Sequence, residues 1–192
     1  MSNTLIKSSN FIKSAIDIEG AFEKEFPHVA FIGRSNVGKS STINALTKNK
    51  GLAKTSSLPG RTRQINLFLI NNKYYFVDLP GYGYSKMSNS KRDDITDMID
   101  SYLFNKKYNQ LKVVLIIDAF VGFTDNDMEM LQALEQNKKE IIVIANKIDR
   151  IKPSQKVLQI KKIKETIGSH KLFFYSAEKQ IGLNEIIQEI FR

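Results

Sequence analysis

The chain has 192 residues, no cysteine, 42% apolar residues and a formal net charge of +9. This length suits one domain, because about 150 residues already bury roughly 70% of the surface that the unfolded chain exposes. The absence of cysteine excludes a disulfide framework, a thiolate metal site and a cysteine nucleophile. The excess of positive charge favours a polyanionic partner, and a solvated cationic surface is the alternative.

The N-terminal sequence MSNTLIKSSNFIK has no apolar core between a basic start and a small-residue cleavage site, which argues against secretion. The longest purely apolar runs, 113–117 and 141–145, have five residues each. A membrane-spanning helix needs about 18–20. We therefore expect a monomeric cytoplasmic protein with no membrane contact.

Residues 1–27 mix polar and scattered apolar side chains, which predicts an N-terminal extension packed on the core. From residue 28 to 192 short apolar runs alternate with helical patterns, which is typical of a sheet with crossover helices. The Asn71-Asn72 dipeptide between two runs marks a hairpin. The expected strands are 28–33, 65–70, 73–78, 112–118, 140–145 and 171–175, and the expected helices are 39–48, 91–104, 126–136, 154–167 and 183–191.

This pattern predicts an α/β fold with a six-stranded, mostly parallel sheet, one antiparallel edge strand and helices on both faces. In segment 154–167 the apolar residues recur at helical spacing, and we expect this stripe to face the core. Its members are Val157, Ile160, Ile163 and Ile167. A ligand site is expected beyond the C-terminal ends of the strands.

The first predicted strand after the extension runs into a phosphate-loop motif, G-x-x-x-x-G-K-[ST], that opens a helix. Gly33 and Gly38 permit a close backbone approach, so successive N–H groups would face the β-phosphate. We expect Lys39 to neutralise the β- and γ-phosphate oxygens and Ser40 to bind Mg²⁺. The alternative is a glycine-bearing turn with a chance Lys-Ser. The expected phosphate-binding residues are Gly33, Arg34, Ser35, Asn36, Val37, Gly38, Lys39, Ser40 and Ser41.

A D-x-x-G motif ends the third of these strands, with the sequence Asp78, Leu79, Pro80, Gly81. Asp78 is expected to hold Mg²⁺ through a water, and the Gly81 N–H to bond the γ-phosphate. A plain strand-ending turn explains the same residues if the motif is taken alone.

The polar segment 54–64 precedes the second strand, and its Thr62 is the best candidate for a second hydroxyl ligand on Mg²⁺. Such a ligand reaches the metal only when a γ-phosphate holds the loop, and two loops of this kind make a switch. An ordinary loop with a chance threonine is the alternative. We assign catalysis to Lys39, Thr62 and Gly81. The expected nucleotide contacts of this loop are Gly60, Arg61, Thr62, Arg63 and Gln64.

The N-K-x-D motif after strand 140–145 predicts a guanine pocket. The Asp149 carboxylate would accept hydrogen bonds from guanine N1–H and N2–H₂, donors that adenine lacks. The Lys147 stem would cover the base, and Asn146 would tie this loop to the phosphate loop. The alternative is a polar connection whose aspartate caps a helix. The motif is Asn146, Lys147, Ile148 and Asp149, and backbone N–H groups of Tyr175, Ser176 and Ala177 are expected near guanine O6.

These motifs, each at the end of a strand and in fixed order, predict a GTP-binding P-loop NTPase with a Ras-like G domain. Many signalling GTPases place a glutamine directly after D-x-x-G to orient the attacking water. Here that residue is Tyr82. We therefore expect slow hydrolysis of GTP to GDP and phosphate.

Four segments also resemble a known family. GRSNVGKSS at 33–41, PGRTRQINLF at 59–68, DLPGYGYS at 78–85 and NKID at 146–149 are similar to the EngB-type bacterial ribosome-biogenesis GTPases (the YsxC/YihA group), within the TrmE-Era-EngA-EngB-Septin-like class. The resemblance spans roughly residues 10–190, and it departs at Asn146, where many members have threonine.

The resemblance implies Mg²⁺-dependent GTP hydrolysis, binding to the large ribosomal subunit and its rRNA during assembly, and a requirement for normal cell division and septation. Asn36 resembles the asparagine that ligates K⁺ in related GTPases, which implies faster hydrolysis in potassium than in sodium.

Residues 147–171 hold eight Lys or Arg residues against two acidic ones. Lys161, Lys162 and Lys164 would suit RNA phosphates, and a solvated helix face is the alternative. Two other functions stay open: a signalling-type G protein with protein effectors, and an RNA-binding module with a structural nucleotide site.

Overall fold

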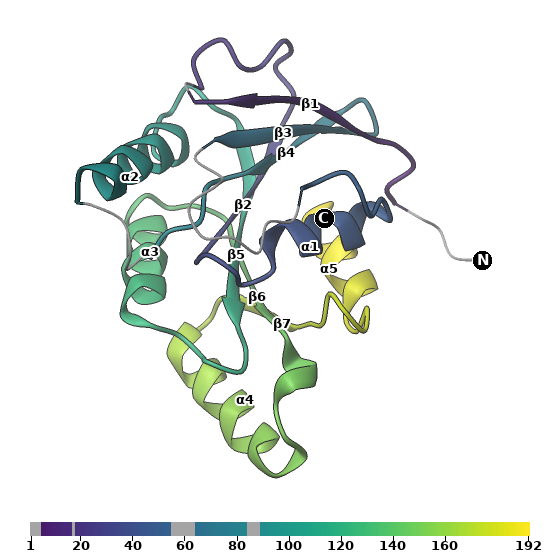
Figure 1. Ribbon diagram of the computed structural model, residues 1–192, viewed down its shortest axis with the longest axis vertical. Helices are drawn as coiled ribbons and strands as arrows, with labels where there is room; N and C mark the ends of the chain where they lie inside the picture. Colours follow the sequence, from purple (N-terminus) through teal and green to yellow (C-terminus); the bar gives the residue numbers. More distant parts are fainter. Residues whose placement is uncertain (1–4, 17, 55–63, 84–88) are drawn as a thin grey trace.

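The computed structural model describes residues 5–16, 18–54, 64–83 and 89–192. Over these residues seven strands form one sheet in the order β1-β3-β4-β2-β5-β6-β7, with helices on both faces (Figure 1). The strands are β1 (Ser9–Ala15), β2 (His28–Gly33), β3 (Ile65–Ile70), β4 (Tyr74–Asp78), β5 (Gln110–Asp118), β6 (Ile141–Asn146) and β7 (Lys171–Phe174). The helices are α1 (Lys39–Thr47), α2 (Asn89–Leu103), α3 (Asp125–Gln136), α4 (Pro153–Ile167) and α5 (Leu183–Ile190), with a 3₁₀ turn, η1 (Ile148–Arg150).

The predicted α/β fold with a mostly parallel sheet is confirmed. Strands β4, β2, β5, β6 and β7 pair in parallel, and β3 pairs antiparallel with β4. The predicted hairpin joins β3 to β4 through Asn71 and Asn72, whose φ angles of 53° and 52° are in the left-handed region. Asparagine tolerates this region better than most residues, which explains why the pair makes this tight turn.

The strand count of six is corrected to seven, and β3 is not the edge strand. The seventh strand, β1, lies within the N-terminal 27 residues and pairs antiparallel with β3, so β1 forms that edge. The sequence of β1, SNFIKSA, has no apolar run like those of the central strands, and none of its residues is fully buried. Backbone pairing holds it, and the Asn71 side-chain oxygen accepts the N–H groups of Lys7 and Ser8 at 2.7 and 3.1 Å.

Two apolar layers cover the sheet. One layer packs α2, α3 and α4 on one face, and the other packs α1 and α5 on the opposite face. Every residue of β2 and of β6 is buried, as expected for central parallel strands. Within the described ranges, no helix has both the length and the apolar character needed to cross a membrane.

The expected apolar stripe of α4 is only partly buried. Ile163 and Ile167 are buried, but Val157 is 81% exposed, which corrects the expectation that it faces the core. The first two turns of α4 extend beyond the sheet, as the lower part of Figure 1 shows. Apolar residues therefore continue at helical spacing along a part of the helix that does not pack on the sheet.

Candidate nucleotide-binding site

The phosphate loop connects β2 to α1 and approaches two neighbouring strands too closely for side chains at its glycines. A Cβ at Gly33 would collide with the Ile116 carbonyl oxygen of β5, and one at Gly38 with the Asn146 amide of β6. Gly38 also has a φ of 96°. Gly38 is the N-cap residue of α1, and no side chain accepts a hydrogen bond from the first-turn N–H groups of this helix. Helix N-termini that bind phosphate leave these N–H groups available in the same way.

Two of the three predicted metal ligands, Ser40 and Asp78, lie together at the start of α1. Lys39 Nζ donates a hydrogen bond of 2.5 Å to Asp78 Oδ1, and Ser40 Oγ lies 3.4 Å from Asp78 Oδ2. One hydroxyl and one carboxylate suit Mg²⁺, which keeps several waters and takes further oxygens from substrate phosphates. Among the described residues there is no cluster of three or more His, Asp or Glu side chains that could hold a metal.

The D-x-x-G turn lies directly against the phosphate loop. A Cβ at Gly81 would be 2.8 Å from Ser35 Oγ and 3.0 Å from the Ser35 backbone nitrogen, so a larger residue there would push the phosphate loop and the turn apart. The Ser35 hydroxyl is buried beside this turn and has no hydrogen-bond partner within the described ranges, so it can still bond a ligand. Leu79 is buried, and its N–H bonds the Phe31 carbonyl at 3.0 Å, which fixes the turn to β2.

The second switch candidate lies outside the described residues. Thr62 and its neighbours Gly60, Arg61 and Arg63 belong to this part, so their predicted roles stay predictions. Gln64 is described, and it is an exposed residue directly before β3.

The base-pocket motif is tied to the phosphate loop. Asn146 Nδ2 donates to the Val37 carbonyl at 2.8 Å, and Lys147 Nζ donates to the Asn36 carbonyl at 2.7 Å. Lys147 and Asn36 both have left-handed φ angles, 66° and 65°. Asp149 is exposed on the one-turn helix η1, whose first N–H bonds the Tyr175 carbonyl at 3.1 Å. The base-side and phosphate-side motifs thus form one connected site.

The three N–H groups expected near guanine O6 already have protein acceptors. Those of Tyr175 and Ser176 bond the carbonyls of Ala145 and Ile181, and that of Ala177 bonds Asn146 Oδ1 at 3.1 Å. A guanine O6 would therefore compete with Asn146 for the Ala177 donor.

Two buried aspartates of the site were not foreseen. Asp118, at the end of β5, accepts a 2.7 Å hydrogen bond from Lys147 Nζ, and Asp127, near the start of α3, accepts bonds from Arg34 and Tyr82. Asp118 could have been found in the sequence, because it directly follows the apolar run 113–117 and so lies at the strand end where a ligand site was expected. For Asp127 the signal was the spacing from Thr124, which forms a capping box.

The predicted basic surface is smaller than the sequence suggested. Lys147 pairs with Asp118, and Lys171 pairs with Glu189 of α5, so both cations already have a carboxylate partner within the protein. Lys161, Lys162 and Lys164 are exposed on α4, where Lys161 makes a loose 3.7 Å pair with Glu165.

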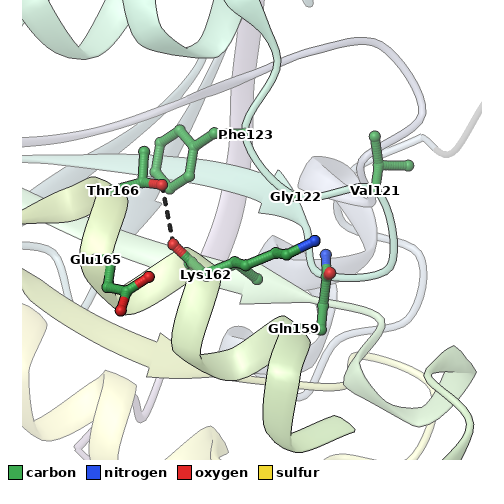
Figure 2. A pocket seen from close by; sticks show the side chains of 8 residues that line it. Val121, Gly122, Phe123, Gln159, Lys162, Glu165 and Thr166 are labelled. Carbon is green, nitrogen blue, oxygen red and sulfur yellow. Dashed lines mark hydrogen bonds between the residues drawn. The ribbon is translucent and has the colours of Figure 1, made fainter. Parts of the chain in front are cut away.

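A cavity of about 480 Å³ lies between α4 and the loop that follows β5 (Figure 2). It is lined by none of the predicted nucleotide-binding residues. Its lining residues are Val121, Gly122, Phe123, Gln159, Lys162, Ile163, Glu165 and Thr166.

Comparison with known sequences also indicates a GTP-binding protein. A family model described as "50S ribosome-binding GTPase" matches residues 28–147. A probable GTP-binding protein EngB of Clostridium perfringens (strain 13 / Type A) is 44% identical over 189 residues, covering 97% of this chain and 95% of that relative. The chain belongs to the EngB family of GTP-binding proteins. The EngB relative of Acholeplasma laidlawii (strain PG-8A) is 38% identical, with 97% of this chain and 98% of the relative covered.

The fold of this EngB family member is similar to those of solved GTP-binding proteins. A crystal structure of a probable GTP-binding protein engB superposes with a TM-score of 0.71 at 27% identity, covering 85% of this chain and 96% of that one. A structure of Era in complex with MgGDPNP and nucleotides 1506–1542 of 16S ribosomal RNA gives a TM-score of 0.65 at 27% identity, covering 88% of this chain and 56% of Era.

Proposed function

We propose that this chain is a nucleotide switch that binds GTP with Mg²⁺, hydrolyses it slowly, and acts in assembly of the large ribosomal subunit. The observation that carries the proposal is the convergence of the phosphate loop, the D-x-x-G turn and the N-K-x-D loop on one site, joined by hydrogen bonds from Asn146 and Lys147. Membership of a GTPase family supports it.

On the phosphate side, Lys39 would leave Asp78 for the β- and γ-phosphate oxygens, since a phosphate carries more charge than one carboxylate. Ser40 would hold Mg²⁺ directly and Asp78 through a water, with Thr62 as the second hydroxyl. The metal would neutralise charge on the transferring phosphoryl group. The Gly81 N–H, next to the open Ser35 hydroxyl, would contact the γ-phosphate.

On the base side, Asp149 would accept the two guanine donors, while the Lys147 stem lies over the base. ATP would leave that carboxylate unpaired, and such a mismatch can discriminate by about 10⁴. The contacts of Lys147 Nζ with Asn36 and Asp118 support this role, because they hold the end of the side chain beside the phosphate loop.

Tyr82 supports the proposal of slow hydrolysis, because its hydroxyl donates to Asp127 at 2.8 Å and is engaged within the protein. Burial, with the Asp127 charge, holds the pKa of this hydroxyl well above its usual value, so it cannot serve as a base. The attacking water would then be oriented by backbone groups or by a partner, with K⁺ held at Asn36.

The ribosomal part of the proposal rests on relatives and on charge. The matching family model is described as ribosome-binding, and a structural relative was solved with ribosomal RNA. Three exposed lysines on α4, Lys161, Lys162 and Lys164, offer a surface for RNA phosphates. A requirement in cell division and septation would follow from ribosome supply.

Co-sedimentation with purified large ribosomal subunits tests this function. We expect pelleting with a non-hydrolysable GTP analogue, less with GDP, and none above background with the matching ATP analogue. Failure to pellet in every state would refute the ribosomal role and favour a G protein with protein effectors.

The RNA surface has its own matched test. Reversing Lys161, Lys162 and Lys164 to glutamate should weaken pelleting and leave GTP affinity unchanged. The control reverses three exposed lysines elsewhere, Lys7, Lys24 and Lys73, with the same change in net charge. An equal loss in both triple variants would show that only the total charge matters.

A further inference from the structure

Asp127 is a completely buried carboxylate that joins three segments of the site. Its Oδ2 accepts hydrogen bonds from Arg34 Nε at 3.0 Å, from the Thr124 N–H at 3.0 Å and from the Thr124 hydroxyl at 2.8 Å. Its Oδ1 accepts the Tyr82 hydroxyl at 2.8 Å. One side chain of α3 therefore links the phosphate loop, the residue after D-x-x-G, and the loop before α3.

The backbone around Tyr82 is held just as closely. The Ser35 N–H of the phosphate loop donates to the Tyr82 carbonyl at 3.2 Å. A Cβ at Gly81 would be 3.0 Å from the Ser35 backbone, and one at Gly83, where φ is 77°, would be 2.9 Å from the Asn126 amide nitrogen. Because Gly81 is buried against Ser35 and directly precedes Tyr82, the position of Tyr82 affects where the Gly81 N–H points.

The Tyr82–Asp127 hydrogen bond is strong for two reasons. The acceptor is an ionised carboxylate, and hydrogen bonds to charged groups are shorter and stronger than neutral ones. The bond is also buried, where losing a partner leaves a desolvated group unpaired. Arg34 balances the carboxylate charge, so Asp127 keeps its capacity to accept the tyrosine hydroxyl.

We propose that Asp127 is a positioning residue which, through the Tyr82 hydroxyl, holds the Gly81 N–H beside the phosphate loop and thereby favours GTP over GDP. The inference rests on the proposed function, because it assumes that Gly81 meets a γ-phosphate. GDP needs the phosphate loop and the base pocket but makes no use of Gly81. Breaking the Tyr82–Asp127 bond therefore weakens GTP binding selectively.

The test compares nucleotide affinities of the full-length protein with Mg²⁺, using a fluorescently labelled non-hydrolysable GTP analogue and labelled GDP. The variants are Tyr82→Phe, which removes one hydroxyl and keeps the ring, Asp127→Asn, and the double variant. The control is Tyr102→Phe, which removes another buried hydroxyl, bonded to His28 and not to the phosphate loop.

We expect Tyr82→Phe to raise the ratio of the GTP-analogue Kd to the GDP Kd about tenfold, the size expected when a buried hydrogen bond to a charged group is lost. The GDP Kd should change less than about twofold. The double variant should shift the ratio no more than the larger single variant, because both changes act on the same Tyr82–Asp127 contact. Tyr102→Phe should leave the ratio unchanged.

An equal loss of affinity for both nucleotides would overturn the proposal, since a merely structural role predicts that result. Additive shifts in the double variant would also overturn it. If Asp127→Asn does not fold, Tyr82→Phe decides the question by itself. Absence of guanine-nucleotide binding by the unaltered protein would refute the proposed function instead, whereas normal binding with an unchanged ratio in Tyr82→Phe would refute only the role of Asp127.

Discussion

Lowering the pH from 7 to 4 should destabilise the fold through His28, the first residue of β2. Its side chain is 3% exposed and stacks on Phe22 with ring centroids 3.9 Å apart, while its Nδ1 lies 3.2 Å from the Tyr102 hydroxyl. Burial lowers the pKa of His28 from 6.5 to about 4. The folded protein therefore keeps this imidazole neutral over a pH range in which the unfolded chain protonates it.

The sign follows from proton binding. Between pH 6.5 and 4 the unfolded state binds a proton at His28 that the folded state does not, so stability is complete above pH 6.5 and is lost as the pH falls. At about 1.4 kcal/mol per pH unit, the loss reaches about 2 kcal/mol at pH 5 and about 3 kcal/mol at pH 4.

The assay is urea unfolding followed by circular dichroism, since the chain has no tryptophan. His28→Phe serves as the reference, because it keeps an aromatic ring against Phe22 and cannot titrate. All other ionisable side chains are the same in both proteins, so the difference between their unfolding free energies isolates His28. That difference should fall by about 3 kcal/mol between pH 7 and 4. Parallel pH profiles for the two proteins would refute the reasoning.

Three further predictions concern packing and specificity. Glu189→Ala should lower the free energy of unfolding by about 3 kcal/mol, because the buried Lys112 ammonium loses a carboxylate 3.1 Å away; a loss under about 1 kcal/mol in urea titrations would contradict this. Asp149→Asn should reduce the preference for GTP over ATP by at least about tenfold in competition binding, and an unchanged preference would place guanine recognition elsewhere. GTP hydrolysis should be faster in K⁺ than in Na⁺, and Asn36→Ala should remove the difference; equal rates of phosphate release in the two salts would exclude a K⁺ site.

Much of the fold was predictable because the central strands are buried on both faces. Strands β2, β5 and β6 are apolar runs bounded by polar residues, and such runs have few alternatives in an α/β chain. Strand β1 was missed because its side chains lie half-exposed on both faces and leave no alternation to detect. The exposure of Val157 was missed because helical spacing does not say how far a helix extends past its sheet.

The site was predictable where the motifs are local, and it was missed where a contact joins distant segments. The phosphate loop and the D-x-x-G turn each lie within a few residues at the end of one strand. Asp118 accepts a hydrogen bond from Lys147, 29 residues away in the sequence. Asp127 accepts hydrogen bonds from Tyr82 and Arg34, which are 45 and 93 residues away. Nothing in local composition identifies those partners, because only the sheet order brings them together.

Strand β1 also protects the sheet against unwanted association between copies of the chain. An open, regular strand edge exposes unpaired backbone groups that can recruit a further strand and begin aggregation. On this side the outermost strand is β1, whose pairing register is interrupted between Phe11 and Lys13, and whose Lys13 adds a charge to the edge. By covering the edge of β3, which is more apolar, strand β1 leaves no long regular edge on this side to which a strand of another copy could pair.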